Sequence, residues 1–134
     1  MKSVFFKLAA AALLVTAFSH SAVADDEAPV SKDVIVSLND VYVPGGFDST
    51  ADAYVVANGL FPNGCYKWKG AEVTNVDSYN HEIRSMASVS QGMCIMVLMP
   101  FTKEIRLGKL ASGSHSLKFV SGDGTFLLKT LKVE

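Results

Sequence analysis

Apolar and polar residues alternate in short runs from residue 33 to the C-terminus, and glycine- or proline-rich turns separate the runs. A period of two is typical of β-strands that bury one face. No helical periodicity is sustained along this part of the chain. We therefore predict an all-β domain, an antiparallel sandwich of about seven or eight strands. The runs place the strands at 33–43, 53–57, 65–76 with an interruption at Gly70, 81–89, 93–99, 102–107, 115–120 and 125–133.

Residues 81–99 predict a β-hairpin whose three-residue loop is Ser90-Gln91-Gly92. A loop of this length with glycine last suits a turn that needs the left-handed conformation. The resulting register pairs Met86 with Met96 across the two strands. The same register gives the core face eight residues, four before the loop and four after it: Ile83, Ser85, Ala87, Val89, Met93, Ile95, Val97 and Met99.

The outer face of this predicted hairpin contains Cys94, Met96 and Leu98. Met96 and Leu98 would then be apolar side chains on a mostly polar sheet face. Such a patch could bind a partner. The alternative is that a loop or the N-terminal segment covers it.

A second candidate contact lies in the loop Pro44–Thr50, where Phe47 stands between glycines and Asp48. An aromatic side chain on a loop is a plausible anchor for a protein partner. A secreted protease inhibitor would use such a loop as a substrate mimic. The alternative is that Phe47 folds back as a lid on the core.

The N-terminus has the three parts of a secretory signal peptide. Lys2 and Lys7 form a positive region, Leu8–Phe18 is an apolar run, and Ala22-Val23-Ala24 is a small-residue cleavage site. The run is shorter than the ~20 apolar residues of a spanning helix. We expect residues 1–24 to be a signal peptide, and therefore export to a periplasm or the extracellular space.

The remaining chain divides into an acidic, flexible segment at residues 25–32 and the sandwich domain at residues 33–134. Removing the signal peptide takes away two lysines and no acid, so the formal net charge of −1 becomes −3. A chain without basic excess is a poor nucleic-acid binder, because phosphates need cations. No second stretch reaches membrane-spanning length, so we expect no membrane span in the mature chain.

Cys65 and Cys94 are the two cysteines of the chain. In an oxidising compartment a lone pair typically forms one intramolecular disulfide, here closing a loop of about 30 residues. A redox pair or a thiolate metal site has less support, because there is no C-x-x-C motif and no histidine near either cysteine.

The sequence predicts no enzyme and no cofactor. His81 and His115 fall in different predicted hairpins, and the side chains of His81 and Glu82 point to opposite faces of a strand. No nucleophile-elbow, zinc-protease, phosphate-loop or dinucleotide-binding motif occurs. We therefore assign no catalytic residue.

A metal site is the alternative that the methionines raise. Thioether ligands suit copper(I), and Met86 and Met96 would be cross-strand neighbours in the predicted hairpin. Two thioethers without a histidine form a weak site. The competing interpretation is that these methionines fill gaps in the core.

The C-terminal half has the pattern Leu110-x-x-Gly113-x-His115-x-Leu117, then a Gly-Asp-Gly hairpin loop and a last strand. It resembles the end of many secreted bacterial immunoglobulin-like domains. The segment Phe61–Tyr66, with the distant Cys94, is similar to a variant in small members of that group. The resemblance implies an immunoglobulin-like sandwich and carries no catalytic residue.

Together these features predict an exported, non-enzymatic binding or interaction module of the periplasm or cell envelope. Its partner would be a protein or another envelope component. The alternatives are a periplasmic copper-handling protein that uses Met86 and Met96, and a secreted protease inhibitor.

Overall fold

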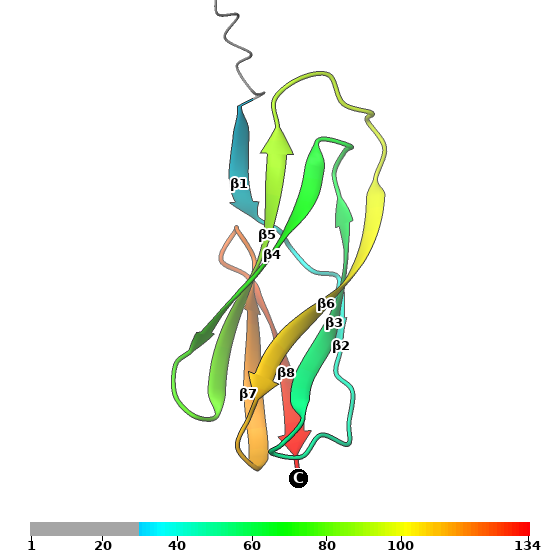
Figure 1. Cartoon of the computed structure of the whole chain (residues 1–134). Helices are drawn as coiled ribbons and strands as arrows, with labels where there is room; N and C mark the ends of the chain where they lie inside the picture. The colour runs from blue at the N-terminus through cyan, green and yellow to red at the C-terminus, as the bar shows by residue number, and fades with distance from the viewer. Residues whose placement is uncertain (1–29) are drawn as a thin grey trace, which may run out of the picture.

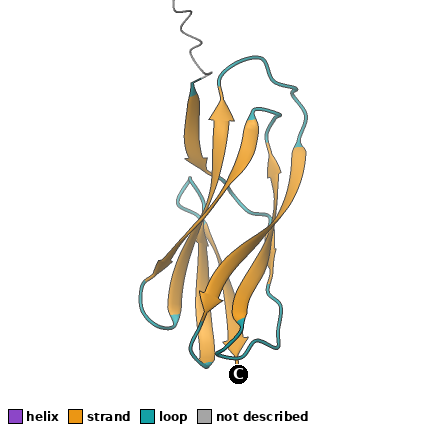
Figure 2. Cartoon of the chain, in the orientation of Figure 1, coloured by secondary structure: helices purple, strands orange, loops and turns teal. Residues whose placement is uncertain are grey.

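The computed structural model describes residues 30–134, so the expected signal peptide and residues 25–29 lie outside the described residues. The described chain is all-β (Figures 1 and 2). Ser31 and Lys32, assigned above to a flexible segment, already belong to the first strand. The strands are β1 Ser31–Ile35, β2 Asp40–Tyr42, β3 Asp52–Phe61, β4 Tyr66–Asn75, β5 Asn80–Ser90, β6 Met99–Lys109, β7 Gly113–Val120 and β8 Phe126–Val133.

The strands form two sheets that pack as a sandwich. One sheet contains β1, β4, β5, β7 and β8, and the other has the order β2-β3-β6. The first predicted strand, residues 33–43, is divided between the sheets, because β1 pairs with β5 and β2 pairs with β3. Residues 30–134 contain no helix that is long and apolar enough to cross a membrane.

One strand pair departs from the antiparallel sandwich that the pattern predicts. β5 and β7 are parallel, with His81 opposite Leu117 and Ile83 opposite Phe119. Parallel neighbours need a long crossover connection. Here β6 is that connection, because the chain leaves β5, crosses to the other sheet as β6, and returns as β7.

The predicted hairpin of residues 81–99 is wrong. β5 is already bonded along its length, to β4 on one side and to β1 and β7 on the other, so no edge is left for residues 93–98. Instead the chain crosses to the second sheet, where β6 pairs with β3. The four residues expected in the core after the turn are therefore exposed: Met93, Ile95, Val97 and Met99.

The core lies between the sheets and follows the predicted alternation elsewhere. Along β5, Ile83, Ser85 and Ala87 are buried as predicted, and His81 joins them. A larger cluster fills one end of the sandwich and a smaller one fills the other. In the smaller cluster the rings of Phe61 and Phe101 are stacked, with centroids 4.3 Å apart. Leu38 and Trp68, which are partly buried, pack against both clusters and connect them.

Candidate functional site

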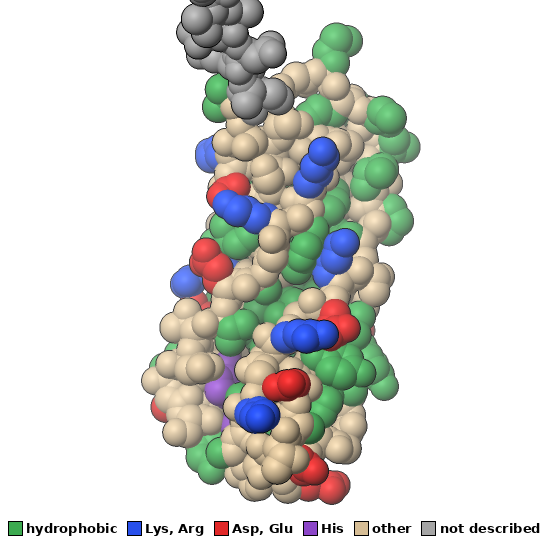
Figure 3. Space-filling view, viewed as in Figure 1, with side chains coloured by type: hydrophobic (Ala, Val, Ile, Leu, Met, Phe, Trp, Pro, Cys, Tyr) green, Lys and Arg blue, Asp and Glu red, His purple; other side chains and the backbone are tan. Residues whose placement is uncertain are grey.

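The most unusual surface of the described chain is the connection between β5 and β6. We call residues 93–99, which include the first residue of β6, the apolar loop. Six of its seven residues are large and apolar, and each is at least 44% exposed: Met93, Ile95, Met96, Val97, Leu98 and Met99. In Figure 3 hydrophobic side chains project along the upper right edge of the molecule, where Figure 1 shows this connection. A run of exposed apolar side chains on this scale is typical of an interaction site.

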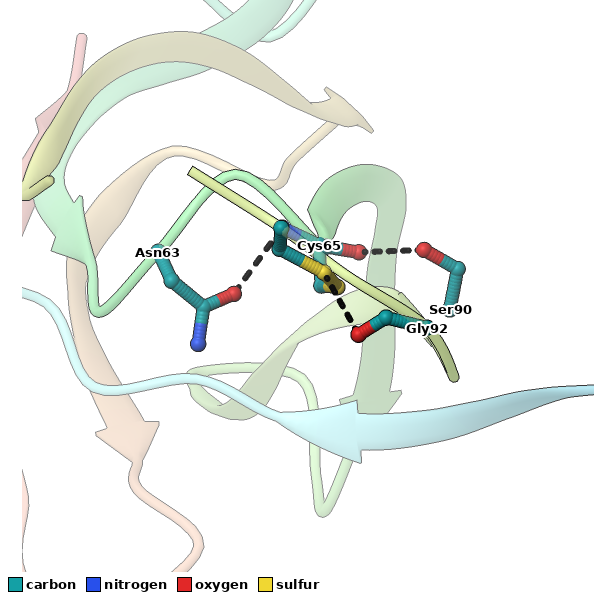
Figure 4. The surroundings of a disulfide bond; sticks show 5 residues. Asn63, Cys65, Ser90 and Gly92 are labelled. Atoms are coloured by element: carbon teal, nitrogen blue, oxygen red, sulfur yellow. Dashed lines mark hydrogen bonds between the residues drawn. A yellow bond between two sulfur atoms is a disulfide. The ribbon is translucent and has the colours of Figure 1, made fainter. Parts of the chain in front are cut away.

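The apolar loop is fastened at its base to the turn between β3 and β4 (Figure 4). Cys65 and Cys94 form the predicted disulfide, with Cα atoms 5.3 Å apart. Gly64 donates its backbone N–H to the carbonyl of Ile95 at 2.9 Å. Cys65 also accepts a backbone hydrogen bond from Ser90, at 3.1 Å. The disulfide therefore joins a turn to a loop at one end of the sandwich, whereas the sequence pattern placed Cys65 and Cys94 in the predicted strands 65–76 and 93–99.

The two cysteines at the base of the apolar loop are less exposed than the rest of the loop. Cys65 is 7% exposed, and Cys94 is the one residue between 91 and 100 that is not exposed. Met93 and Ile95, the residues on either side of Cys94, are both exposed. The sequence alone did not show this, because the same residues also fit a strand pattern.

Met96 and Leu98, the residues predicted to form an outer patch, are 81% and 64% exposed. They lie on the apolar loop and not on a sheet face. Met86 lies in the middle of β5, opposite Ile35 and Gly70. The predicted pairing of Met86 with Met96 is therefore wrong, and the copper alternative loses the cross-strand neighbourhood on which it depended.

The loop Pro44–Thr50 has a structural role. Phe47 is half-buried, packs on the larger core cluster, and meets the ring of Tyr54 edge-on at 5.4 Å. Its backbone bridges to Val133. The structure thus favours the core-lid interpretation of Phe47.

Asp48 shapes the same loop. Its Oδ1 accepts hydrogen bonds from the Thr50 hydroxyl at 2.6 Å, the Thr50 N–H at 2.8 Å and the Ala51 N–H at 3.0 Å. These bonds, led by the one from the Thr50 hydroxyl, lower the pKa of Asp48. The side chain is exposed, but its oxygen Oδ1 is engaged in the turn.

Two histidines that the sequence placed in separate hairpins are brought together by the parallel pair β5–β7. His81 Nε2 lies 2.8 Å from His115 Nδ1. His81 Nδ1 lies 2.6 Å from Asn75 Oδ1, and His115 Nε2 lies 2.7 Å from the carbonyl oxygen of Ala111. Both side chains are buried. Their core-face positions, beside Ile83 and Leu117, are the sequence signal that could have identified them.

The partners of the outer ring nitrogens determine which nitrogens of the histidine pair donate hydrogen bonds. Because the carbonyl of Ala111 only accepts, His115 Nε2 must donate to it. When both rings are neutral, His115 accepts at Nδ1 from His81 Nε2–H. His81 Nδ1 must then accept a hydrogen bond, and Asn75 supplies the donor when its side-chain amide is turned so that Nδ2 faces the ring. Burial, and next the proximity of His115, lower the pKa of His81, while Asp77 opposes them. The buried pair therefore favours the neutral form of His81.

A surface depression of about 490 Å³ adjoins this pair. Its lining includes His81, Asp77 and Lys109. Among residues 30–134, no group of three or more His, Cys, Asp or Glu side chains is arranged to hold a metal ion. The four ring nitrogens of the pair are all engaged within the protein, so the depression has no free imidazole to offer.

Comparison with known proteins identifies a family. Residues 55–133 match the family described as the ORF11 beta-sandwich domain, and this range covers most of β3, all of β4 to β8, and both cysteines. No curated protein and no solved structure matched the chain. The matched range is more than half of the chain and corresponds to the two-sheet arrangement described above. The chain therefore belongs to the ORF11 beta-sandwich domain family.

Proposed function

We propose that this protein is an exported, non-enzymatic binding module, and that the apolar loop is its contact surface. The observation that carries the proposal is the exposure of six large apolar side chains on a loop fastened by a disulfide. Burying one such side chain against a partner would contribute about 1.5–3 kcal/mol of hydrophobic free energy to binding. Fastening the base reduces the conformational entropy that binding would cost.

Two features support export. The N-terminal sequence has the charged, apolar and small-residue regions of a signal peptide. The Cys65–Cys94 disulfide is the kind of bond that persists in oxidising compartments. Both features support the proposal of a periplasmic or secreted location, and an envelope component is the class of partner that we propose.

The histidine pair supports a non-enzymatic role. A general base must reach a substrate proton with a free nitrogen. In this pair His81 and His115 bond to each other, and their outer nitrogens bond to Asn75 and Ala111. We assign the pair to the structure of the core and not to chemistry.

We also propose that the sandwich is a variant of the immunoglobulin-like architecture. Its support is the resemblance of the C-terminal half, together with a first strand region that is shared between the two sheets. The parallel pair β5–β7 is the feature in which this variant differs from the purely antiparallel arrangement.

Photo-crosslinking in the producing cells tests the contact surface. A diazirine amino acid at position 96 should give a covalent adduct with the bound component. The matched control is position 76, because Val76 is also well exposed, at 66%, but lies at the opposite end of β4. Adducts at 96 and none at 76 support the proposal. Equal labelling at both positions, or none at 96, would refute it.

A further inference from the structure

The apolar loop has a definite place in the molecule. It caps one end of the elongated sandwich, beside the start of β1 (Figure 1). We call this the loop end. Two more exposed apolar side chains lie there: Val30, whose carbonyl accepts a hydrogen bond from Gln91, and Leu60, which faces Pro100 in the β3–β6 pair. The exposed apolar side chains of the loop end therefore come from the apolar loop, the start of β1 and the end of β3.

The chemistry of the apolar loop distinguishes a lipid surface from a protein groove. Apart from Cys94, its side chains are aliphatic or thioether, with no aromatic residue and no arginine. Protein hot spots are enriched in tryptophan, tyrosine and arginine. Partition into a bilayer scales with the buried apolar area, which isoleucine, leucine, valine and methionine supply.

Three lysines near the apolar loop form no ion pair in the described part of the chain. Lys32 and Lys67 lie on strands that flank the end of β5, opposite Val89 and Ser88. Lys103 lies four residues beyond the loop, on β6. In residues 30–134, the acids next to these lysines in the sequence are Asp33 and Glu104, and they pair with Lys69 and Arg106. The loop thus has a partial collar of lysines, which favours an anionic surface.

We propose that the apolar loop inserts into the headgroup region of an anionic phospholipid bilayer, with Lys32, Lys67 and Lys103 contacting lipid phosphates. Shallow insertion suits a loop of this kind, because its unpaired backbone groups stay in hydrated surroundings. The disulfide at the base holds the loop while its side chains enter the membrane. This inference rests on the proposed function, since it names the partner of the same surface.

Flotation with lipid vesicles tests the inference on the purified protein. One set of vesicles contains phosphatidylcholine alone, and the other contains equal parts of phosphatidylcholine and phosphatidylglycerol. The wild type should float with the anionic vesicles at least about tenfold more strongly than with the neutral ones, and less strongly as salt is added. Met96→Asp should reduce this binding about tenfold or more, because a charge must then enter the interface.

Val76→Asp is the matched control. It places the same new charge on another exposed apolar residue, 66% exposed, directly after the far end of β4, and it should float like the wild type. Lys67→Glu with Lys103→Glu should weaken binding to anionic vesicles and leave the weak binding to neutral vesicles unchanged. Circular dichroism of each variant verifies that it folds.

Three results would overturn the inference. The wild type could fail to float with either vesicle, Met96→Asp could float as well as the wild type, or the crosslink at position 96 could join only a protein. The last result would leave the proposed function standing, because the apolar loop would still be the contact surface. Absence of any adduct at position 96 would remove both proposals.

Discussion

His81 Nε2 lies 2.8 Å from His115 Nδ1, although the two histidines are 34 residues apart in the sequence. They meet because β5 and β7 are parallel neighbours, with the chain passing through β6 between them. The contact is buried, and its two outer nitrogens bond to Asn75 and Ala111. The pair is therefore a polar element inside the core, and it links protonation to stability.

Protonation of His81 should make the domain less stable in mild acid. The folded-state pKa of His81 is lowered, mainly by burial, so the unfolded chain takes up its proton first. The free energy of unfolding should then be fully retained above about pH 6.5, the unfolded value, and should decrease as the pH falls toward the folded pKa. Chemical denaturation at pH 7 and pH 5 measures the difference.

His81→Gln removes the titrating group and should flatten this dependence between pH 7 and pH 5. Three hydrogen-bonded aspartates do not interfere in this range. Hydrogen bonds lower the pKa values of Asp48, Asp77 and Asp123 below 3.8, so the stability that they contribute is lost only at more acidic pH. An equal decrease in the variant and the wild type would contradict the assignment.

Removing the disulfide should destabilise the domain and loosen the apolar loop. Cys65 and Cys94 are 29 residues apart, which corresponds to about 3.5 kcal/mol in the chain-entropy account. The double variant Cys65→Ser with Cys94→Ser should unfold at lower denaturant concentration. Limited proteolysis should cut it faster between residues 91 and 98. In the wild type, thiol labelling under denaturing, non-reducing conditions should find no free thiol, whereas two labelled cysteines would contradict the disulfide.

Gly59 should not tolerate a side chain. A Cβ at this position would overlap the ring of Phe101 and lie 3.1 Å from the carbonyl oxygen of Ser37. Because that ring is stacked in the core, Gly59→Ala should cost about 1–3 kcal/mol of stability. Gly45→Ala is the control, since no atom lies within 4 Å of its added Cβ. Thermal melts compare the two, and equal melting temperatures would argue against the packing described.

Phe47 and Met96 should respond differently to substitution. Phe47 is half-buried on the core, so Phe47→Ala should lower the free energy of unfolding by about 2 kcal/mol. Met96 is 81% exposed, so Met96→Asp should leave stability within about 0.5 kcal/mol of the wild type. Denaturation of both variants, with capture of bound components, separates folding from binding. A stable Phe47→Ala variant that loses its partner would restore Phe47 as an anchor.

The alternation of apolar and polar residues determined much of the fold. It predicted the all-β class, most strand positions and the buried face of β5, because a strand with one face in the core must repeat with a period of two. The two cysteines were enough to predict the disulfide. These features depend on local sequence or on residue count, and they do not require knowledge of which strands are neighbours.

The tertiary structure decided the rest. Residues 93–98 have the composition of a buried strand, but β5 is already paired on both sides, so the chain crosses to the other sheet and leaves these side chains exposed. The same crossover makes β5 and β7 parallel and brings His81 to His115. Strand pairing is a competition among all segments for a limited number of edges. A pattern read along one segment does not contain the outcome of that competition, and here it determined both the apolar loop and the histidine pair.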